Sequence, residues 1–145
     1  MKVAKFGGSS LASFEQVNKV VQIIKADDAR RFIVVSAPGK RNANDTKVTD
    51  LLLQLYQARL EKNSPEPFVQ KIMARYQEIG QPFHVDASIF SIIEENLSHL
   101  ASHPFQNDAY YLDVLLASGE NNNAKLMAGI LQAEGLNARY LSPQE

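Results

Sequence analysis

The residues best suited to bind an anion lie near the start of the chain, where Lys5 precedes Gly7-Gly8-Ser9-Ser10 by two positions. Glycine has no Cβ, so its backbone N–H groups can approach a bulky phosphate closely, and the serines add hydroxyl groups. A lysine fixed on the preceding strand would supply a compensating charge. The residue order differs from a Walker A loop, where the lysine follows the glycines, and from G-x-G-x-x-G. A tight turn beside a solvated lysine explains the same residues equally well.

Three further polar residues stand at the boundaries of predicted elements. Ser36 ends an apolar run, Thr49 opens a helical pattern, and Glu120 follows Ala117-Ser118-Gly119. Each also has an ordinary structural interpretation. The serine could satisfy its own backbone, the threonine could be a first-turn residue, and a helix dipole favours a first-turn glutamate. Residue type alone therefore favours the ordinary interpretation, most clearly for Glu120.

Apolar spacing predicts the elements that must position these groups. A β-prone segment over 1–6, a helix over 14–26 capped by Ser13, and an apolar run over 31–36 form a strand-helix-strand unit. The apolar run is typical of a parallel strand covered on both faces. Further helices are expected over 48–62, 65–80 and 87–103, then from Asn107 or Asp108 to 116 and, after an interruption at 117–119, over 120–134, with a third strand over 138–141.

This order of elements predicts an α/β fold with a mainly parallel sheet and a helix-rich insertion. Ligands of open α/β sheets bind beyond the carboxyl ends of the strands, which points to residues 7–10, 36–47 and those after 141. Three strands make a small sheet for so many helices. We therefore expect the 145 residues to be the N-terminal portion of a larger domain.

Composition excludes several classes of protein. The chain has no cysteine and three histidines, which excludes a disulfide framework, a thiolate nucleophile and a Cys-ligated zinc site, so any metal would arrive with a substrate. Fifteen basic residues balance 16 acidic ones, for a net charge of -1, which argues against nucleic-acid binding. The apolar runs are too short to span a membrane and no signal peptide is recognisable. We expect a soluble, cytoplasmic protein.

Four motifs resemble, in order and spacing, the opening of aspartate kinases, which have the amino-acid kinase fold. They are KFGGSS at 5–10, VSAPGK at 35–40, VTDLL at 48–52 and ASGE at 117–120. The resemblance covers essentially the whole chain. It implies a three-layer amino-acid kinase fold of which residues 1–145 form the N-terminal part.

The resemblance also implies a reaction, in which the γ-phosphoryl group of ATP, carried with Mg²⁺, passes to the side-chain carboxylate of L-aspartate. The product is 4-phospho-L-aspartate, the first intermediate towards lysine, threonine and methionine. Lys5 would be the catalytic cation on the transferred group. Thr49 and Glu120 would bind aspartate, with Glu120 receiving its ammonium group. The implied phosphate-binding residues are Lys5, Gly7, Gly8, Ser9 and Ser36, and no side chain is implied as a metal ligand.

The chain is much shorter than an aspartate kinase, whose second half supplies the adenine pocket and is followed by regulatory ACT domains. We therefore expect no appreciable kinase activity from these 145 residues alone. The resemblance also implies that the parent enzyme is a homo-oligomer. Two alternatives stay open. One is another family member that acts on glutamate, acetylglutamate or uridine monophosphate, and the other is a non-catalytic fragment that serves as an interaction module.

Overall fold

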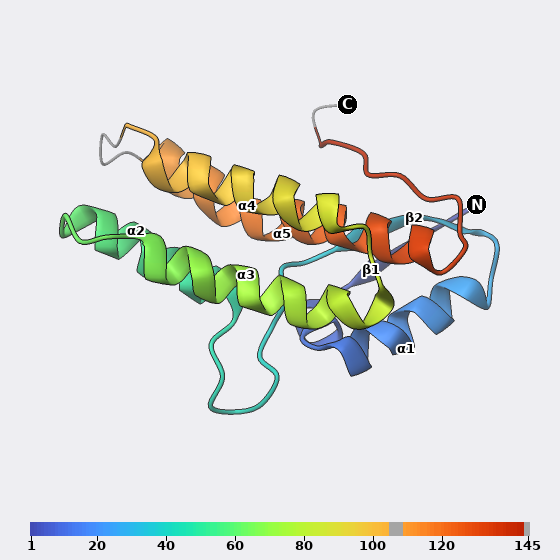
Figure 1. Cartoon of the computed structure of the whole chain (residues 1–145). Helices are drawn as coiled ribbons and strands as arrows, with labels where there is room; N and C mark the ends of the chain where they lie inside the picture. The colour runs from blue at the N-terminus through green and yellow to red at the C-terminus, as the bar shows by residue number, and fades with distance from the viewer. Residues whose placement is uncertain (105–108, 144–145) are drawn as a thin grey trace.

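The computed structural model describes residues 1–104 and 109–143 and has the predicted α/β character (Figure 1). Strands β1 (Lys2–Phe6) and β2 (Arg30–Val35) are joined through the short 3-10 helix η1 (Gly8–Leu11) and through α1 (Phe14–Lys25). Then follow α2 (Val48–Leu60), α3 (Glu66–Gly80), the 3-10 helix η2 (Gln81–Phe83), α4 (Ala87–Ser102) and α5 (Ala109–Ala133). The helix start predicted at Asn107 or Asp108 lies outside the described residues.

Helices α2 to α5 pack together as a four-helix bundle beside the strands, in which α2 and α4 each contact both α3 and α5 (Figure 1). Their apolar stripes interlock in one core, and the predicted caps are confirmed for two helices. Ser13 Oγ accepts a hydrogen bond from Gln16 N at 3.3 Å, and Asp86 Oδ1 accepts one from Ser88 N at 2.9 Å. Among the described residues, no helix is both long and apolar enough to cross a membrane. The most deeply buried core side chains include Leu52, Leu55, Ile72, Tyr76, Leu126 and Ile130.

The two strands pair in parallel and bury only one face of the sheet. Val35 is buried on that face, next to Phe6 in the strand register. On the other face, Val3, Phe32 and Val34 are 68%, 44% and 45% exposed. The prediction that residues 31–36 are covered on both faces is therefore wrong within the described chain, because no described element packs over this second face.

The third strand predicted over 138–141 is absent from the described residues, where the sheet has two strands. Residues 136–142 form no ladder and instead lie against α5 through side chains. Gln132 Nε2 donates to the carbonyl of Ala138 at 2.7 Å, and the hydroxyl of Tyr140 bonds to the amide oxygen of Asn121. A strand requires a partner edge, and helix contacts take that place here.

The break predicted at residues 117–119 is also wrong, because α5 runs through them unbroken. Gly119 sits at a tight crossing: a Cβ there would lie 3.0 Å from Ala37 Cβ and 3.1 Å from Leu52 Cδ1. The buried Ser118 hydroxyl donates to the carbonyl of Leu115 at 2.5 Å. Small residues here therefore serve close packing of a helix, not its termination. The helix does end as predicted near Gly135, which has a φ of +88°.

Candidate functional site

The glycine turn after β1 lies directly against the loop after β2. Gly39 N donates to Gly8 O at 2.9 Å. A Cβ on Gly39 would lie 2.7 Å from Gly8 C, which is too close for a side chain at this position. Ser36 N donates to Phe6 O at 3.2 Å and continues the strand pairing up to this point. The carboxyl ends of the two strands thus meet, as expected for a parallel sheet, and bring the 7–10 and 36–39 segments together.

Helix α2 begins at the same place. Val48 N donates to Pro38 O at 3.1 Å, which joins the first turn of α2 to the segment that follows β2. Thr49 is the next residue and is half-buried. The long loop from Lys40 to Lys47 leaves this point and projects from the body of the molecule (Figure 1).

Helix α5 reaches the site with its middle turns. Gly119 packs on Ala37, so the following Glu120 stands beside the end of β2 and is exposed. Asn123 Nδ2 donates to Ser36 O at 2.7 Å, and Tyr76 Oη donates to Gly119 O at 2.9 Å. Burial raises the pKa of the Tyr76 hydroxyl, which keeps it protonated as a donor.

The structure brings the segments carrying Gly8, Ser36, Thr49 and Glu120 together, whereas no hydrogen bond or ion pair joins Lys5 to any of them. Lys5 lies beside Val34 in the register, on the exposed face of the sheet. Within the described chain, the side chains of Lys5, Thr49 and Glu120 make no hydrogen bond or ion pair. These polar groups are therefore available to a ligand.

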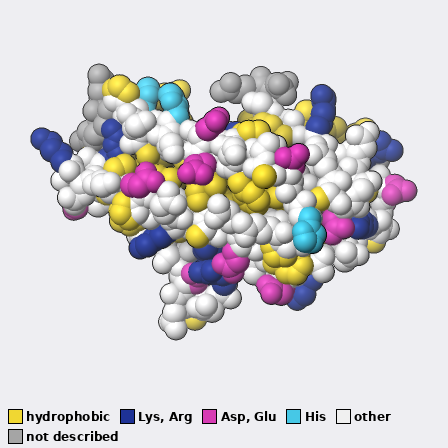
Figure 2. All heavy atoms as spheres, in the orientation of Figure 1, with side chains coloured by type: hydrophobic (Ala, Val, Ile, Leu, Met, Phe, Trp, Pro, Cys, Tyr) yellow, Lys and Arg dark blue, Asp and Glu magenta, His cyan; other side chains and the backbone are white. Residues whose placement is uncertain are grey.

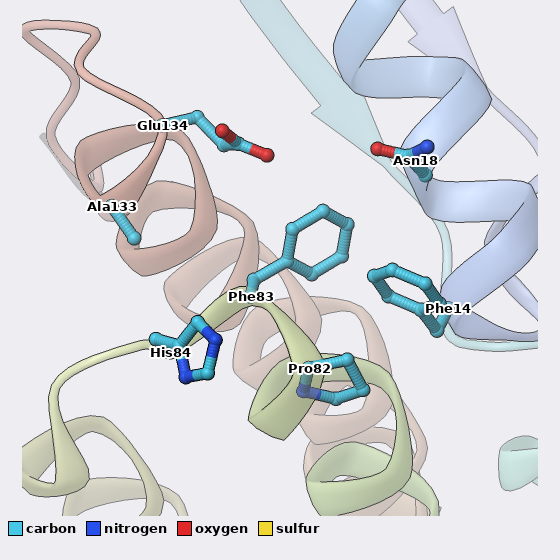
Figure 3. Close-up of a pocket in the computed structure, with 7 residues that line it drawn as sticks. All are labelled: Phe14, Asn18, Pro82, Phe83, His84, Ala133 and Glu134. Atoms are coloured by element: carbon cyan, nitrogen blue, oxygen red, sulfur yellow. The ribbon is translucent and has the colours of Figure 1, made fainter.

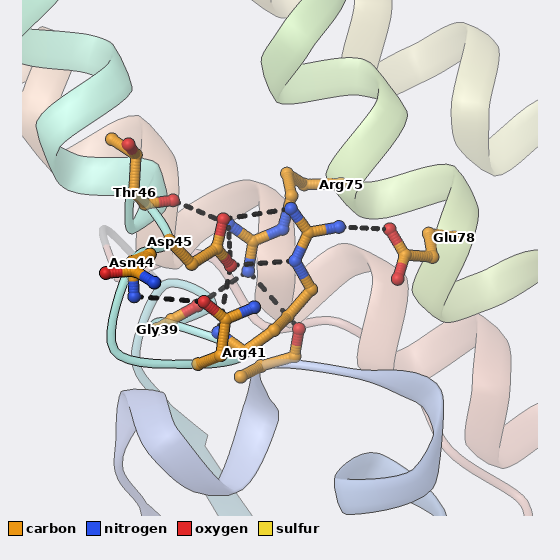
Figure 4. A network of polar contacts seen from close by, with 9 residues as sticks. Gly39, Arg41, Asn44, Asp45, Thr46, Arg75 and Glu78 are labelled. Atoms are coloured by element: carbon orange, nitrogen blue, oxygen red, sulfur yellow. Dashed lines mark hydrogen bonds and ion pairs between the residues drawn. The ribbon is translucent and has the colours of Figure 1, made fainter.

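A charged network holds the base of the 40–47 loop (Figure 4). Arg41 forms a two-pronged pair with Asp45, with Nε and Nη2 at 2.7 and 2.9 Å from its carboxylate oxygens, and reaches Glu78 at 2.6 Å. Figure 2 shows basic and acidic side chains together where this loop joins the body. The Arg41 hydrogen bond is the main reason that the pKa of Asp45 lies far below its usual range, and the same bond raises the pKa of Arg41.

A separate open groove of about 350 Å³ lies between α1, η2 and the end of α5 (Figure 3). Phe14 and Phe83 face each other in it with ring centroids 4.7 Å apart. None of the predicted site residues lines it. The groove is lined by Phe14, Asn18, Pro82, Phe83, His84, Ala133 and Glu134.

A metal site is not evident either among the residues that the structure describes. No three His, Asp or Glu side chains in this part of the chain are grouped so that they could hold a metal ion.

Sequence reasoning missed the buried polar residues around the site. Asn122 and Asn123 are 0% and 3% exposed, and Asn122 Nδ2 donates to Asn96 Oδ1 at 3.0 Å, so the Asn121–Asn123 run is largely an internal feature. Arg75 is only 4% exposed. One signal was available for it: Arg75 lies between Ile72 and Ile79 on the apolar stripe of α3, where a charge is unusual.

Comparison with known proteins agrees with this geometry. The sequence matches the Amino acid kinase family over residues 1–145. It is 43% identical to Aspartokinase 3 of Bacillus subtilis (strain 168) over all 145 residues of the chain, which correspond to 32% of that protein.

Solved structures of aspartate kinases share the fold of this chain. The aspartate kinase of Clostridium acetobutylicum superposes with a TM-score of 0.79 at 33% identity, over 90% of this chain and 29% of that one. Aspartokinase III of E. coli, in complex with aspartate and ADP, superposes with a TM-score of 0.70 at 24% identity, over 94% of this chain and 30% of that one. The chain thus spans about a third of the length of these relatives. It belongs to the amino acid kinase family, as an aspartokinase-like part of the kinase domain.

Proposed function

We propose that this chain supplies the acceptor and phosphate-binding half of a site that phosphorylates the side-chain carboxylate of L-aspartate with ATP. The observation that carries the proposal is the meeting of the KFGGSS, VSAPGK, VTDLL and ASGE segments at one end of the sheet, in a chain 43% identical to an aspartokinase. That identity favours aspartate over the other acceptors used in the family.

In the proposed reaction, a carboxylate oxygen of aspartate attacks the γ-phosphorus of ATP. A new O–P bond forms, the bond from the γ-phosphorus to the bridging oxygen breaks, and ADP leaves. Two anions must be brought together, so positioning and charge neutralisation supply most of the catalysis. Mg²⁺ would arrive with the nucleotide and offset part of its charge.

The phosphate side of the site would be formed by the segment after β1. Lys5 would place its ammonium beside the transferred phosphoryl group. The Ser36 hydroxyl would face the reacting groups from the end of β2. The backbone amides of Gly7, Gly8 and Ser9 would donate to phosphate oxygens.

The acceptor side would be formed by α2 and α5. Thr49 offers a neutral hydroxyl donor to a carboxylate, and Glu120 offers a carboxylate to the substrate ammonium. A dicarboxylate that lacks the ammonium group would leave the charge of Glu120 unpaired, so this residue would discriminate in favour of an amino acid.

Calorimetric titration tests the acceptor side. We expect the parent chain to bind L-aspartate and to bind succinate at least about tenfold more weakly, because one charge-assisted hydrogen bond is lost. Glu120→Gln should remove that preference. The control is Glu94→Gln, an exposed glutamate on α4. Equal aspartate binding by Glu120→Gln and the parent would remove Glu120 from this role.

The nucleotide side is tested by a coupled ATP-turnover assay. Because the chain spans about a third of the length of its relatives, we expect no aspartate-dependent ATP turnover from the chain alone. Turnover by these 145 residues would show that they hold a complete site. The homo-oligomeric state of the parent enzyme and its cytoplasmic location remain predictions.

A further inference from the structure

Arg75 of α3 brings three separate backbone segments to one side chain. Its Nη1 donates to the carbonyl of Thr46 at 2.7 Å, and its Nη2 donates to the carbonyls of Gly39 at 2.6 Å and Ala12 at 3.2 Å. These acceptors are 29, 36 and 63 positions away in the sequence. Figure 4 shows the guanidinium between the base of the 40–47 loop and α3.

The environment of Arg75 is unfavourable for a charge unless these contacts compensate for it. Burial lowers the pKa of Arg75, and the Asp45 carboxylate, 3.5 Å away, acts in the opposite direction. The Nε of Arg75 is buried without a partner. An apolar side chain of similar size would avoid the desolvation cost but would leave the three carbonyls without this donor. The guanidinium thus offers these carbonyls a fixed, planar set of donors.

Each of the three carbonyls belongs to a segment that carries residues of the candidate site. Ala12 closes the turn that begins with Gly7 and Gly8. Gly39 accepts from Arg75 through its carbonyl while its N–H donates to Gly8 O at 2.9 Å. Thr46 lies three residues before Thr49. One side chain therefore connects the phosphate segment, the end of β2 and the start of α2.

We propose that Arg75 is a positioning residue, which sets the spacing between the phosphate-binding turn and the aspartate-binding start of α2. This inference rests on the proposed function for its consequence, but the positioning itself concerns only the backbone. Arg41 holds the same loop from outside, through Asp45 and Glu78, and makes none of the three carbonyl contacts. Arg41 therefore provides a matched control.

Hydrogen exchange measured by mass spectrometry tests the positioning on the full chain. In Arg75→Met, peptides covering 7–12 and 37–48 should lose protection by about tenfold or more, because several charged hydrogen bonds are removed locally. Peptides covering 53–63 and 125–136 should change by less than about threefold. Arg41→Gln should leave protection of the 7–12 peptide unchanged.

Arg75→Lys separates the effect of the donor geometry from that of the positive charge. It also replaces Arg75→Met as the test variant if Arg75→Met does not fold. Lysine keeps the charge but cannot present two forked nitrogens to three carbonyls, so the same two peptides should lose protection. Protection equal to that of the parent in Arg75→Lys, or a uniform loss over all peptides, would overturn the proposal.

Aspartate titration of the same variants connects the inference to function. Affinity should fall about tenfold in Arg75→Lys and stay unchanged in Arg41→Gln. If the parent binds no aspartate, the proposed function fails for this chain, and the exchange data still decide the positioning. If the parent binds and Arg75→Lys binds equally well, the positioning role is wrong while the proposed function stands.

Discussion

Replacing Gly39 by alanine should separate the two turns that form the candidate site. The new Cβ would lie 2.7 Å from Gly8 C, 2.8 Å from Gly8 O and 3.0 Å from Ser9 N, and all three are backbone atoms that no side-chain rotation can move. The clash adds about 1–3 kcal/mol of overpacking, and loss of the hydrogen bond from Gly39 N to Gly8 O adds about 1 kcal/mol.

Gly7→Ala is the matched control, because a Cβ there has nothing within 4 Å and Gly7 has an ordinary φ of −84°. Both substitutions reduce the entropy of the unfolded chain alike, so the difference between them isolates the clash together with the lost hydrogen bond, at about 2–4 kcal/mol. With a urea m-value of about 2 kcal/mol per M, the Gly39→Ala midpoint should lie about 1–2 M below that of Gly7→Ala. Equal midpoints by circular dichroism would refute the close contact between the two turns.

Three further substitutions test other parts of the structure. The apolar side chains on the exposed sheet face lead us to expect self-association of the chain through this face. Phe32→Lys places a charge there; it should leave the unfolding midpoint nearly unchanged and shift sedimentation towards monomer, whereas an unchanged distribution would show that this face does not drive association. Asp45→Asn should destabilise the chain at pH 6, and the destabilisation should be clearly smaller at pH 2. The folded-state pKa of Asp45 is depressed, so its stabilisation is present above about pH 4 and fades as pH falls; a gap that is constant with pH would contradict this. Asn123→Ala removes the donor to Ser36 O and should cost about 1–3 kcal/mol in urea unfolding; a loss below about 0.5 kcal/mol, as for an ordinary surface site, would contradict it.

Local signals predicted the elements well where they depend on neighbouring residues. The capping serine and aspartate, Ser13 and Asp86, mark helix starts because a short side chain satisfies the exposed N–H groups of the first turn. The apolar spacing of Val17, Val20 and Val21 marks the buried side of α1. These helices can therefore be predicted without knowledge of the rest of the fold.

The wrong predictions concern residues whose role depends on a distant partner. The apolar spacing at 138–141 is compatible with a strand, but a strand forms only where its backbone pairs with a sheet edge, and this segment instead lies against α5. Gly119 is typical of a helix end in isolation, yet it allows α5 to cross close to Ala37. The carbonyl partners of Arg75 could not be predicted either, since they are up to 63 positions away.

The exposed sheet face has a consequence for charge as well as for packing. Lys5 shares that face with Val34, its partner in the register. Coulomb attraction between unit charges 4 Å apart is about 1 kcal/mol in bulk water and about 4 kcal/mol at an effective dielectric constant of 20. Any polypeptide that covers the apolar strands would also exclude water from around Lys5. In the proposed reaction, covering this face would therefore strengthen the Coulomb attraction between Lys5 and a phosphoryl group several-fold without moving the lysine, and the cost of desolvating the ammonium group would offset part of that gain.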